Sequence, residues 1–407
     1  MNEPRAVQDA EGSAYGLKSG THDAELTEVG PGTPCGEWLR RYWHPVAVSA
    51  NLTTRPQKIR ILGEDLIVFR DGKGRPGLLT PRCAHRGTSL YYGKVDEDGI
   101  RCCYHGWQFD VQGRCLDQPC EPEGGAHRDK IRQPWYPVEE IYGLVFAYMG
   151  PPSKKPLLPR WDALENLPAG DTIYACGYTG IGVGADDTVE IIPWSWLQNL
   201  DNIMDPVHVS TLHTRHRAIQ YTPEARHLPK VEFEYSDLGI AYIAHRKNAT
   251  GRTVKRVSVA LMPHVVLVPD QQLDITGPTT YLRWMVPVDD HSHVLFHSLR
   301  IRPGQDPKIT FLNVSRPRAM GDDTTWSDMS EEQHQTYPTD WEAMASQGSI
   351  TLHSDEHLAS SDKGVVMLRR LMRQQIRLVQ EGGDPMGVSF DPAKTVNQVG
   401  AGNYYLD

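Results

Sequence analysis

Two short cysteine–histidine pairs constrain this chain more than any other feature of its sequence. The first is Cys83 and His85 in RCAHRG. The second lies in RCCYHGW, where His105 follows two adjacent cysteines, Cys102 and Cys103. A loop that holds two such side chains close together can turn both toward one point, and two loops can enclose a metal. The chain has seven cysteines, an odd number, and four of them fall between residues 102 and 120. This pattern favours a metal site over a disulfide framework.

The candidate ligands are two cysteines and two histidines, with either Cys102 or Cys103 as the second cysteine. Zinc accepts such a set as a tetrahedron. A Rieske [2Fe–2S] centre also accepts it, because two cysteines hold one iron and two histidines hold the other. The spacing alone does not separate these metals. Gly87, Gly106 and Trp107 favour the cluster, because a redox centre needs a dry surround and backbone N–H donors to its sulfurs.

A second candidate site lies in QNLDNIMDPVHVSTLH, which contains Asp205, His208 and His213. Two imidazoles and one carboxylate form the triad that holds non-haem Fe(II) and leaves positions open for O2 and substrate. We expect residues 194–213 to form an irregular helix. On a regular helix the two histidines would lie about 140° apart, so they can share an iron only where the helix is distorted or ends between them. Pro206 removes a backbone donor at this point and favours such a distortion.

Both segments resemble the large (alpha) subunit of the Rieske non-haem iron aromatic ring-hydroxylating oxygenases. The resemblance runs from GPGTPCGEWLRRYWHPVA to EHLASSDKGVVMLRR and is greatest to the branch of phthalate dioxygenase and dehydrodivanillate O-demethylase. The family motif is C-x-H, a gap, and then C-x-x-H-G-W, which selects Cys102 rather than Cys103. The resemblance implies two cofactors, a Rieske [2Fe–2S] cluster and a mononuclear Fe(II). The cluster residues that it implies are Cys83, His85, Cys102 and His105, with Trp107 beside them.

At the second centre the resemblance implies His208 and His213 as iron ligands, with Asn202 near the iron. It implies that Asp205 is a bridge, which links an iron-binding histidine to a Rieske histidine of the neighbouring subunit.

The third iron ligand must come from far along the chain, and Asp340, Asp355 and Asp362 are the candidates. The family places this carboxylate ahead of a helix that carries Gln-Gly, and Asp340 stands seven residues before Gln347. We therefore expect Asp340 to bind the iron, and Asp355 and Asp362 to cap the last helix.

The remaining patterns predict an α+β fold. Alternating apolar residues at 59–69, and in GWQFDVQGRCL and YGLVFAYMG, predict short strands, and PPSKKPLLPR marks a boundary. HVVLVP, TYLRWMVPV and HVLFHSLRI predict strands of one antiparallel sheet, and apolar residues at helical spacing from Val365 to Val379 predict a final core-facing helix. We expect an N-terminal arm and helix over 1–44, a small all-β Rieske domain over 45–150, and a catalytic domain over 151–407 with an antiparallel sheet flanked by helices.

Composition narrows the range of partners. The formal net charge is −9 without a long basic run, which argues against nucleic acid. No apolar stretch approaches the ~20 residues that cross a bilayer. The first 25 residues are acidic and lack the apolar core of a signal peptide, so we interpret them as a partly disordered arm. We therefore expect a cytoplasmic protein without membrane contact.

The family resemblance implies an enzyme of the EC 1.14 class, the terminal component of a system with a separate flavin and ferredoxin-type reductase. It implies a homotrimer, or a dimer of trimers. The expected substrates are O2 and a small aromatic compound, typically a carboxylate, which is hydroxylated on the ring or O-demethylated. Arg215, Arg217 and Arg283 are candidates to bind that carboxylate. The alternatives are a non-catalytic Rieske electron carrier and a zinc-stabilised binding protein.

Overall fold

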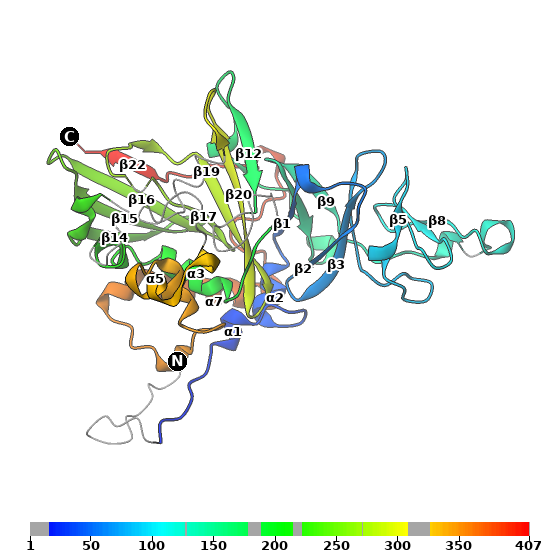
Figure 1. Ribbon diagram of the computed structural model, residues 1–407, viewed down its shortest axis with the longest axis horizontal. Coiled ribbons are helices and arrows are strands. Elements are labelled where there is room, and N and C mark those ends of the chain that lie inside the picture. Colours follow the sequence, from blue (N-terminus) through cyan, green and yellow to red (C-terminus); the bar gives the residue numbers. More distant parts are fainter. Residues whose placement is uncertain are drawn as a thin grey trace.

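The computed structural model of the chain describes residues 16–126, 128–177, 189–214, 222–270, 272–307 and 326–406. Small antiparallel sheets form one end of the molecule. A large antiparallel sheet with helices against one side forms the rest (Figure 1). The expected α+β class is confirmed. Residues 1–15 of the expected arm lie outside the described residues, and so do Arg215 and Arg217.

Three antiparallel sheets build the small unit, in the strand orders β1-β10-β9, β2-β3-β4 and β5-β6-β7-β8. Ile67, Phe69 and Phe109 are fully buried in a core that also contains Cys83 and Cys102. The cysteines of the candidate metal site therefore lie inside an apolar core of their own. The strands are β1 (Trp43–Val48), β2 (Gln57–Ile61), β3 (Glu64–Arg70), β4 (Pro76–Leu79), β5 (Lys94–Val95), β6 (Ile100–Arg101), β7 (Gln108–Phe109), β8 (Cys115–Asp117), β9 (Val138–Ile141) and β10 (Leu144–Tyr148).

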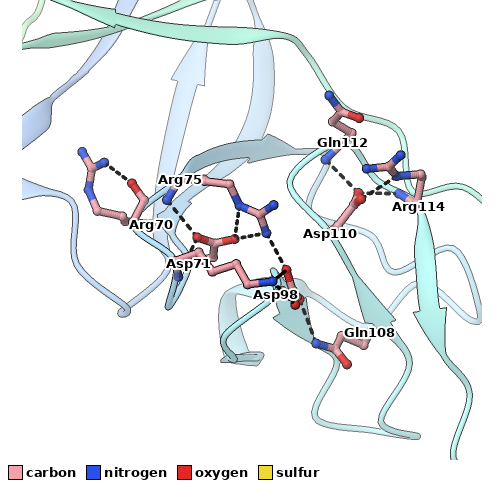
Figure 2. Close-up of polar contacts among 10 residues, drawn as sticks. Arg70, Asp71, Arg75, Asp98, Gln108, Asp110, Gln112 and Arg114 are labelled. Atoms are coloured by element: carbon pink, nitrogen blue, oxygen red, sulfur yellow. Dashed lines mark hydrogen bonds and ion pairs between the residues drawn. The ribbon is translucent and has the colours of Figure 1, made fainter.

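The turn between β3 and β4 is built around one aspartate. In the sequence DGKGR, Oδ1 of Asp71 accepts hydrogen bonds from the backbone N–H groups of Lys73 and Arg75, at 3.1 and 2.8 Å. Its Oδ2 pairs with the Arg75 guanidinium at 2.6 Å (Figure 2). Gly74 completes the turn with a φ of 80°, which glycine adopts without strain.

The turn between β7 and β8 repeats this construction in the sequence DVQGR. Oδ1 of Asp110 accepts from the N–H groups of Gln112 and Arg114 at 2.9 and 2.8 Å, and Oδ2 pairs with Arg114 (Figure 2). The turn between β3 and β4 also contacts the sheet β5–β8, because Arg75 pairs at 2.8 Å with Asp98, which lies between β5 and β6. These contacts hold the sheet β5–β8 against the sheet β2–β4.

The large sheet has the order β12-β20-β19-β17-β16-β15-β14, and β13, β18 and β22 pair outside this order. The three strands predicted at 264–269, 280–288 and 293–301 are β17, β19 and β20, which are neighbours, so this prediction is confirmed. The strands are β12 (Thr172–Cys176), β13 (Ile191–Ile192), β14 (Lys230–Tyr235), β15 (Gly239–Lys247), β16 (Thr253–Leu261), β17 (Val265–Leu267), β18 (Gly277–Pro278), β19 (Tyr281–Asp289), β20 (Ser292–Ile301) and β22 (Gly402–Tyr405), while β11 (Arg160–Trp161) pairs in parallel with β21 (Val396–Asn397).

Helices lie below the large sheet in the view of Figure 1. The predicted final helix is α7, which buries Val365, Leu368, Met372 and Ile376 on one stripe, as expected. An ion pair of 2.7 Å between Arg369 on α7 and Asp201 on α3 joins these two helices. The helices are α1 (Ala24–Thr27), α2 (Pro34–Leu39), α3 (Trp196–Ile203), α5 (Glu331–Thr336), α6 (Asp340–Ala345) and α7 (Lys363–Gln380).

The helix predicted over 194–213 is wrong in its extent. It is α3, which ends at Ile203, and the chain continues through a turn into a short 3-10 helix, His208–Ser210. Pro206 explains the end of α3, because it lacks an N–H group and disfavours helical geometry in the residue before it. The break that the histidine spacing required is therefore a helix end that precedes both histidines.

Candidate metal centres

Two loops of the small unit carry the cysteine–histidine pairs, and they share one backbone geometry. In each loop the cysteine carbonyl accepts a hydrogen bond from the N–H of a glycine four residues later. The distances are 2.8 Å for Gly87 to Cys83 and 3.0 Å for Gly106 to Cys102. Both glycines have positive φ, at 78° and 73°. A side chain at either glycine would strain the tight turn that brings cysteine and histidine together.

The four side chains meet between these loops. Cys83 and Cys102 are each 3% exposed. Burial raises the pKa of Cys83 to about 11, and the neighbouring Cys102 thiol adds to the rise. The rings of His85 and His105 lie 4.5 Å apart at 73°, and Trp107 stacks on His85 at 4.4 Å. Two adjacent buried thiols and two adjacent, partly exposed imidazoles, with an indole stacked on one of them, match the donor set of a Rieske cluster.

The spread of these donors argues against a single zinc ion. A tetrahedral zinc at 2.0–2.3 Å from its ligands holds them within about 4 Å of one another. Among the described residues, His208, His213 and Asp340 are the set of metal-binding side chains whose donor atoms all lie within 4.8 Å. The loop donors are more widely spread, as a cluster of two irons requires. Cys103 is exposed, whereas Cys102 is buried beside Cys83.

Gln133 holds the first loop, and sequence analysis missed it. Its side chain is fully buried. Oε1 accepts a hydrogen bond from the Ala84 N–H at 2.8 Å, and Nε2 donates to the carbonyls of Thr80 and Arg82 at 2.9 and 2.8 Å. A single glutamine outside the motif has no spacing that marks it.

At the second centre, Asp205 shapes the turn that follows α3. Its Oδ1 accepts hydrogen bonds from the N–H groups of Val207 and His208, at 2.8 and 3.3 Å. Its Oδ2 lies 3.3 Å from Nδ1 of His208, and its side chain is 26% exposed. Asp205 therefore contacts the ring nitrogen of His208 that faces away from Asp340 and also reaches the molecular surface.

His208, His213 and Asp340 converge. The Nε2 atoms of the two histidines lie 3.4 and 3.2 Å from the same oxygen of Asp340, Oδ1. Asn202 on α3 donates to that oxygen at 3.0 Å. His213 is 3% exposed. Two imidazole nitrogens and a carboxylate oxygen at these separations fit one iron of the two-histidine, one-carboxylate class.

Electrostatics keep this carboxylate ionised. Burial alone would favour the neutral acid, yet His213 and His208 hold the pKa of Asp340 well below its usual range. Burial also disfavours a charged His208, but Asp205 and Asp340 raise the pKa of His208 to about 10. A metal cation bound by these groups would take the place of the proton between them, because metal ligands bind in their deprotonated forms.

The other two candidate carboxylates lie elsewhere. Asp355 accepts a hydrogen bond from Ser354 Oγ at 3.1 Å, and Asp362 accepts from the Ala359 N–H at 2.6 Å. Asp362 occupies the N-cap position of α7 but makes no side-chain cap bond to that helix, so the expected cap is wrong. Asp362 Oδ2 accepts from a residue earlier in the chain because the 3-10 helix Ser360–Asp362 comes directly before α7.

Asp340 depends on the packing of α6 against α3. Gln198 on α3 donates to the carbonyls of Met344 and Gly348 at 3.0 and 3.1 Å. A capping box between Thr339 and Glu342 begins α6 directly before Asp340. Sequence analysis missed Gln198 and Glu342, because their contacts join segments far apart in the chain.

Comparison with known proteins places the chain in a family. A model of the Rieske [2Fe-2S] domain matches residues 42–137. The alpha subunit of phenoxybenzoate dioxygenase from Ectopseudomonas oleovorans is 50% identical to this chain over 411 residues, which span 100% of this chain and 97% of that protein. The chain belongs to the Rieske oxygenases. The oxygenase subunit of 5,5'-dehydrodivanillate O-demethylase from a Sphingobium species is 32% identical over 93% of this chain and 85% of its own length.

A solved structure has the same fold. Dicamba monooxygenase bound to dicamba matches with a TM-score of 0.61 at 18% identity, over 84% of this chain and 99% of that one. As a Rieske oxygenase, the chain is an oxidoreductase that uses O2, a Rieske [2Fe–2S] cluster and a mononuclear iron. The oxygenase of carbazole 1,9a-dioxygenase, solved in complex with a ferredoxin, also has this fold, with a TM-score of 0.57 at 20% identity over 89% of this chain and 94% of that one. Within the described residues, no helix is both long and apolar enough to span a bilayer.

Proposed function

We propose that this Rieske oxygenase hydroxylates an aromatic carboxylate at an Fe(II) ion bound by His208, His213 and Asp340. The convergence of both histidine Nε2 atoms on one oxygen of Asp340 is the observation that carries the proposal. The substrate class follows the relatives, one of which is named for phenoxybenzoate.

Cys83, His85, Cys102 and His105 are the proposed ligands of the cluster that supplies electrons. The buried thiol pair and the adjacent imidazoles support this assignment. We assign the Rieske domain to 45–150 and the catalytic domain to 151–407, after the arm and helix of 1–44. The family match at 42–137 supports the first of these ranges.

The residues around the iron site position its ligands. An iron bound there by two histidines and one carboxylate would supply the site that activates O2. Asn202 fixes the orientation of Asp340 through its 3.0 Å hydrogen bond. Asp205 orients the His208 ring from the opposite nitrogen, which is the usual role of a carboxylate behind a metal-bound imidazole.

We assign Asp205 a second role, as the bridge to His85 or His105 of a neighbouring subunit in a homotrimer or a dimer of trimers. The partial exposure of Asp205 supports this role. So does the separation of the two centres within one chain, because the loops near β5 and β8 lie at one end of Figure 1, whereas the helices around α3 lie beneath the large sheet, away from that end. We place the enzyme in the cytoplasm with a flavin and ferredoxin-type reductase. Its seven cysteines, all within the described residues, form no disulfide, as is usual in a reducing compartment.

The variant Asp205→Asn tests this bridge. We expect it to keep the iron and sulfide content of the wild type and to lose at least about ten-fold in the rate at which substrate oxidation follows cluster reduction. Stopped-flow absorbance of the cluster, with product analysis, measures both. Unchanged coupled turnover would remove the bridging role.

A single turnover tests the proposed function itself. The purified, iron-loaded protein is reduced, exposed to O2 and offered benzoates, phthalates, phenoxybenzoates and methoxylated aromatic acids. A hydroxylated or dihydroxylated ring identifies a ring hydroxylase, and formaldehyde in step with a phenol identifies an O-demethylase. Oxidation of the cluster without product from any of these acids would contradict an aromatic carboxylate as substrate.

A further inference from the structure

One face of the large sheet contacts residues 194–214, the segment that carries the two proposed histidine ligands of the iron. Arg246 on β15 donates from Nη2 to the Pro206 carbonyl at 3.1 Å and to Ser210 Oγ at 3.3 Å. His293 on β20 contacts the Trp194 carbonyl through Nδ1 at 2.7 Å, just before α3. These two side chains come from strands at different positions in the sheet, and both reach the segment from 194 to 214.

The strand register shows that Arg283 lies on this same face. Directly opposed residues of antiparallel strands, and alternate residues of one strand, share a face. His293 and His297 lie four residues apart on β20, and Arg283 on β19 opposes His297. Arg283 also opposes Val266 on β17, and Val266 opposes Ala260 on β16. Two residues before Ala260, Ser258 opposes Tyr242 on β15, and Arg246 lies four residues after Tyr242. All of these side chains therefore share one face.

Among the residues that the structure describes, no carboxylate pairs with Arg283. Its Nε is buried without a hydrogen-bond partner among the described residues. Its neighbour His297 stays neutral, because burial and the Arg283 guanidinium hold the pKa of that histidine well below its usual range, and a neutral imidazole does not balance a cation. By contrast, Arg256 on this face donates to the backbone carbonyls of Pro269 and Asp270. A guanidinium stays charged at every relevant pH, so a half-buried one without a partner favours an anion beside it.

We propose that Arg283 binds the carboxylate of the substrate and makes this oxygenase select aromatic acids over neutral aromatic compounds. The inference rests on the proposed function. If the iron binds at His208, His213 and Asp340, the substrate lies against the sheet face that contacts residues 194–214, which is the face of Arg283. The planar guanidinium matches the two oxygens of a carboxylate in a bidentate pair, and such a pair fixes the direction of the aromatic ring as well as its affinity. Arg283 is thus a specificity-determining residue that anchors one end of the substrate.

Ligand binding without O2 tests this assignment. Isothermal titration of the iron-loaded protein with 3-phenoxybenzoate and 3-phenoxybenzamide compares an acid with a neutral compound of almost the same shape. We expect Arg283→Gln to weaken binding of the acid by at least about ten-fold, which corresponds to about 1.4 kcal/mol. Binding of the amide should change by less than about three-fold, and Arg283→Lys should retain part of the preference for the acid.

The matched control is Lys255→Gln. Lys255 is a half-buried cation on β16 next to Arg256, so its side chain projects from the opposite face of the same sheet. This control should leave the acid-to-amide ratio unchanged. An unchanged ratio in Arg283→Gln, or a wild type that does not prefer the acid, would overturn the proposal. The titration involves no turnover, so a failure to form product in the single-turnover experiment would count against the proposed function and leave the role of Arg283 to be judged by this ratio.

Discussion

The two metal centres of this chain are built in opposite ways. The four proposed cluster ligands all come from residues 83 to 105, on two turns with the same glycine geometry. The proposed iron site joins His208 and His213 to a carboxylate at residue 340, which reaches them because α6 packs on α3. The first centre is therefore fixed by local backbone conformation, whereas the second is fixed by tertiary packing. The predictions below test this difference, from the largest expected effect to the smallest.

Removal of one ligand from each centre should separate their losses. We expect Cys83→Ser to lose the red-brown colour and the acid-labile sulfide of the cluster. We expect His213→Ala to keep the colour and to lose at least about 100-fold in turnover, because even residues that only orient a metal ligand contribute about 10- to 100-fold. Visible spectra, sulfide assay and single-turnover product yield measure these effects. Colour loss in His213→Ala would show that the centres do not assemble independently.

Two buried glutamines offer a finer test of the same contrast. Gln133 clamps the first cysteine loop and Gln198 clamps α6 to α3. Each substitution by alanine removes buried hydrogen bonds worth about 1–3 kcal/mol to its own centre. We expect Gln133→Ala to speed cluster loss in mild denaturant, and Gln198→Ala to lower the occupancy of the mononuclear iron.

Gln112→Ala is the control, because its backbone, rather than its side chain, contacts Asp110 at the turn. It should change neither centre. Equal effects of the two clamp variants on both centres would contradict the separation between local and tertiary assembly.

The contact between the small sheets and the large sheet should make the stability of the protein fall in acid. His44 on β1 and His264, just before β17, are buried with their ring nitrogens 2.7 Å apart. Burial lowers the pKa of His44 to about 4 and holds that of His264 well below its usual range. Both stay neutral in the folded protein, so below pH 6.5 the unfolded chain binds more protons. Stability is thus full above about pH 6.5 and is lost as the pH falls toward 4.

At pH 5 the loss from His44 alone should be about 2 kcal/mol. Chemical denaturation at pH 7, 6 and 5 measures it. His264→Gln should flatten this dependence relative to the wild type, and His357→Gln, at an exposed position, should leave it as it is. A wild-type stability that does not fall between pH 7 and 5 would show that the pair is not buried as neutral histidines.

Sequence reasoning succeeds where a feature depends on local spacing and fails where it depends on tertiary packing. The motifs at 83–105 and 205–213 mark both centres because their spacing is local. Asp340 was reached only through the family resemblance, and nothing local separated it from Asp355 or Asp362. Strands β15 and β16 were missed because Arg246 and Arg256 are buried in the sheet and interrupt the apolar alternation that reveals a strand. Contacts such as that of Gln198 with α6 appear only once the chain is folded.

The ratio of iron to acid-labile sulfide in Asp340→Ala and Asp355→Ala tests the central claim, that a distant carboxylate completes a second, separate iron site. The wild type should contain about three irons for every two sulfides. Asp340→Ala should contain about two irons for every two sulfides, and Asp355→Ala should match the wild type. A full iron complement in Asp340→Ala, or loss of the third iron in Asp355→Ala, would contradict this assembly of the iron site.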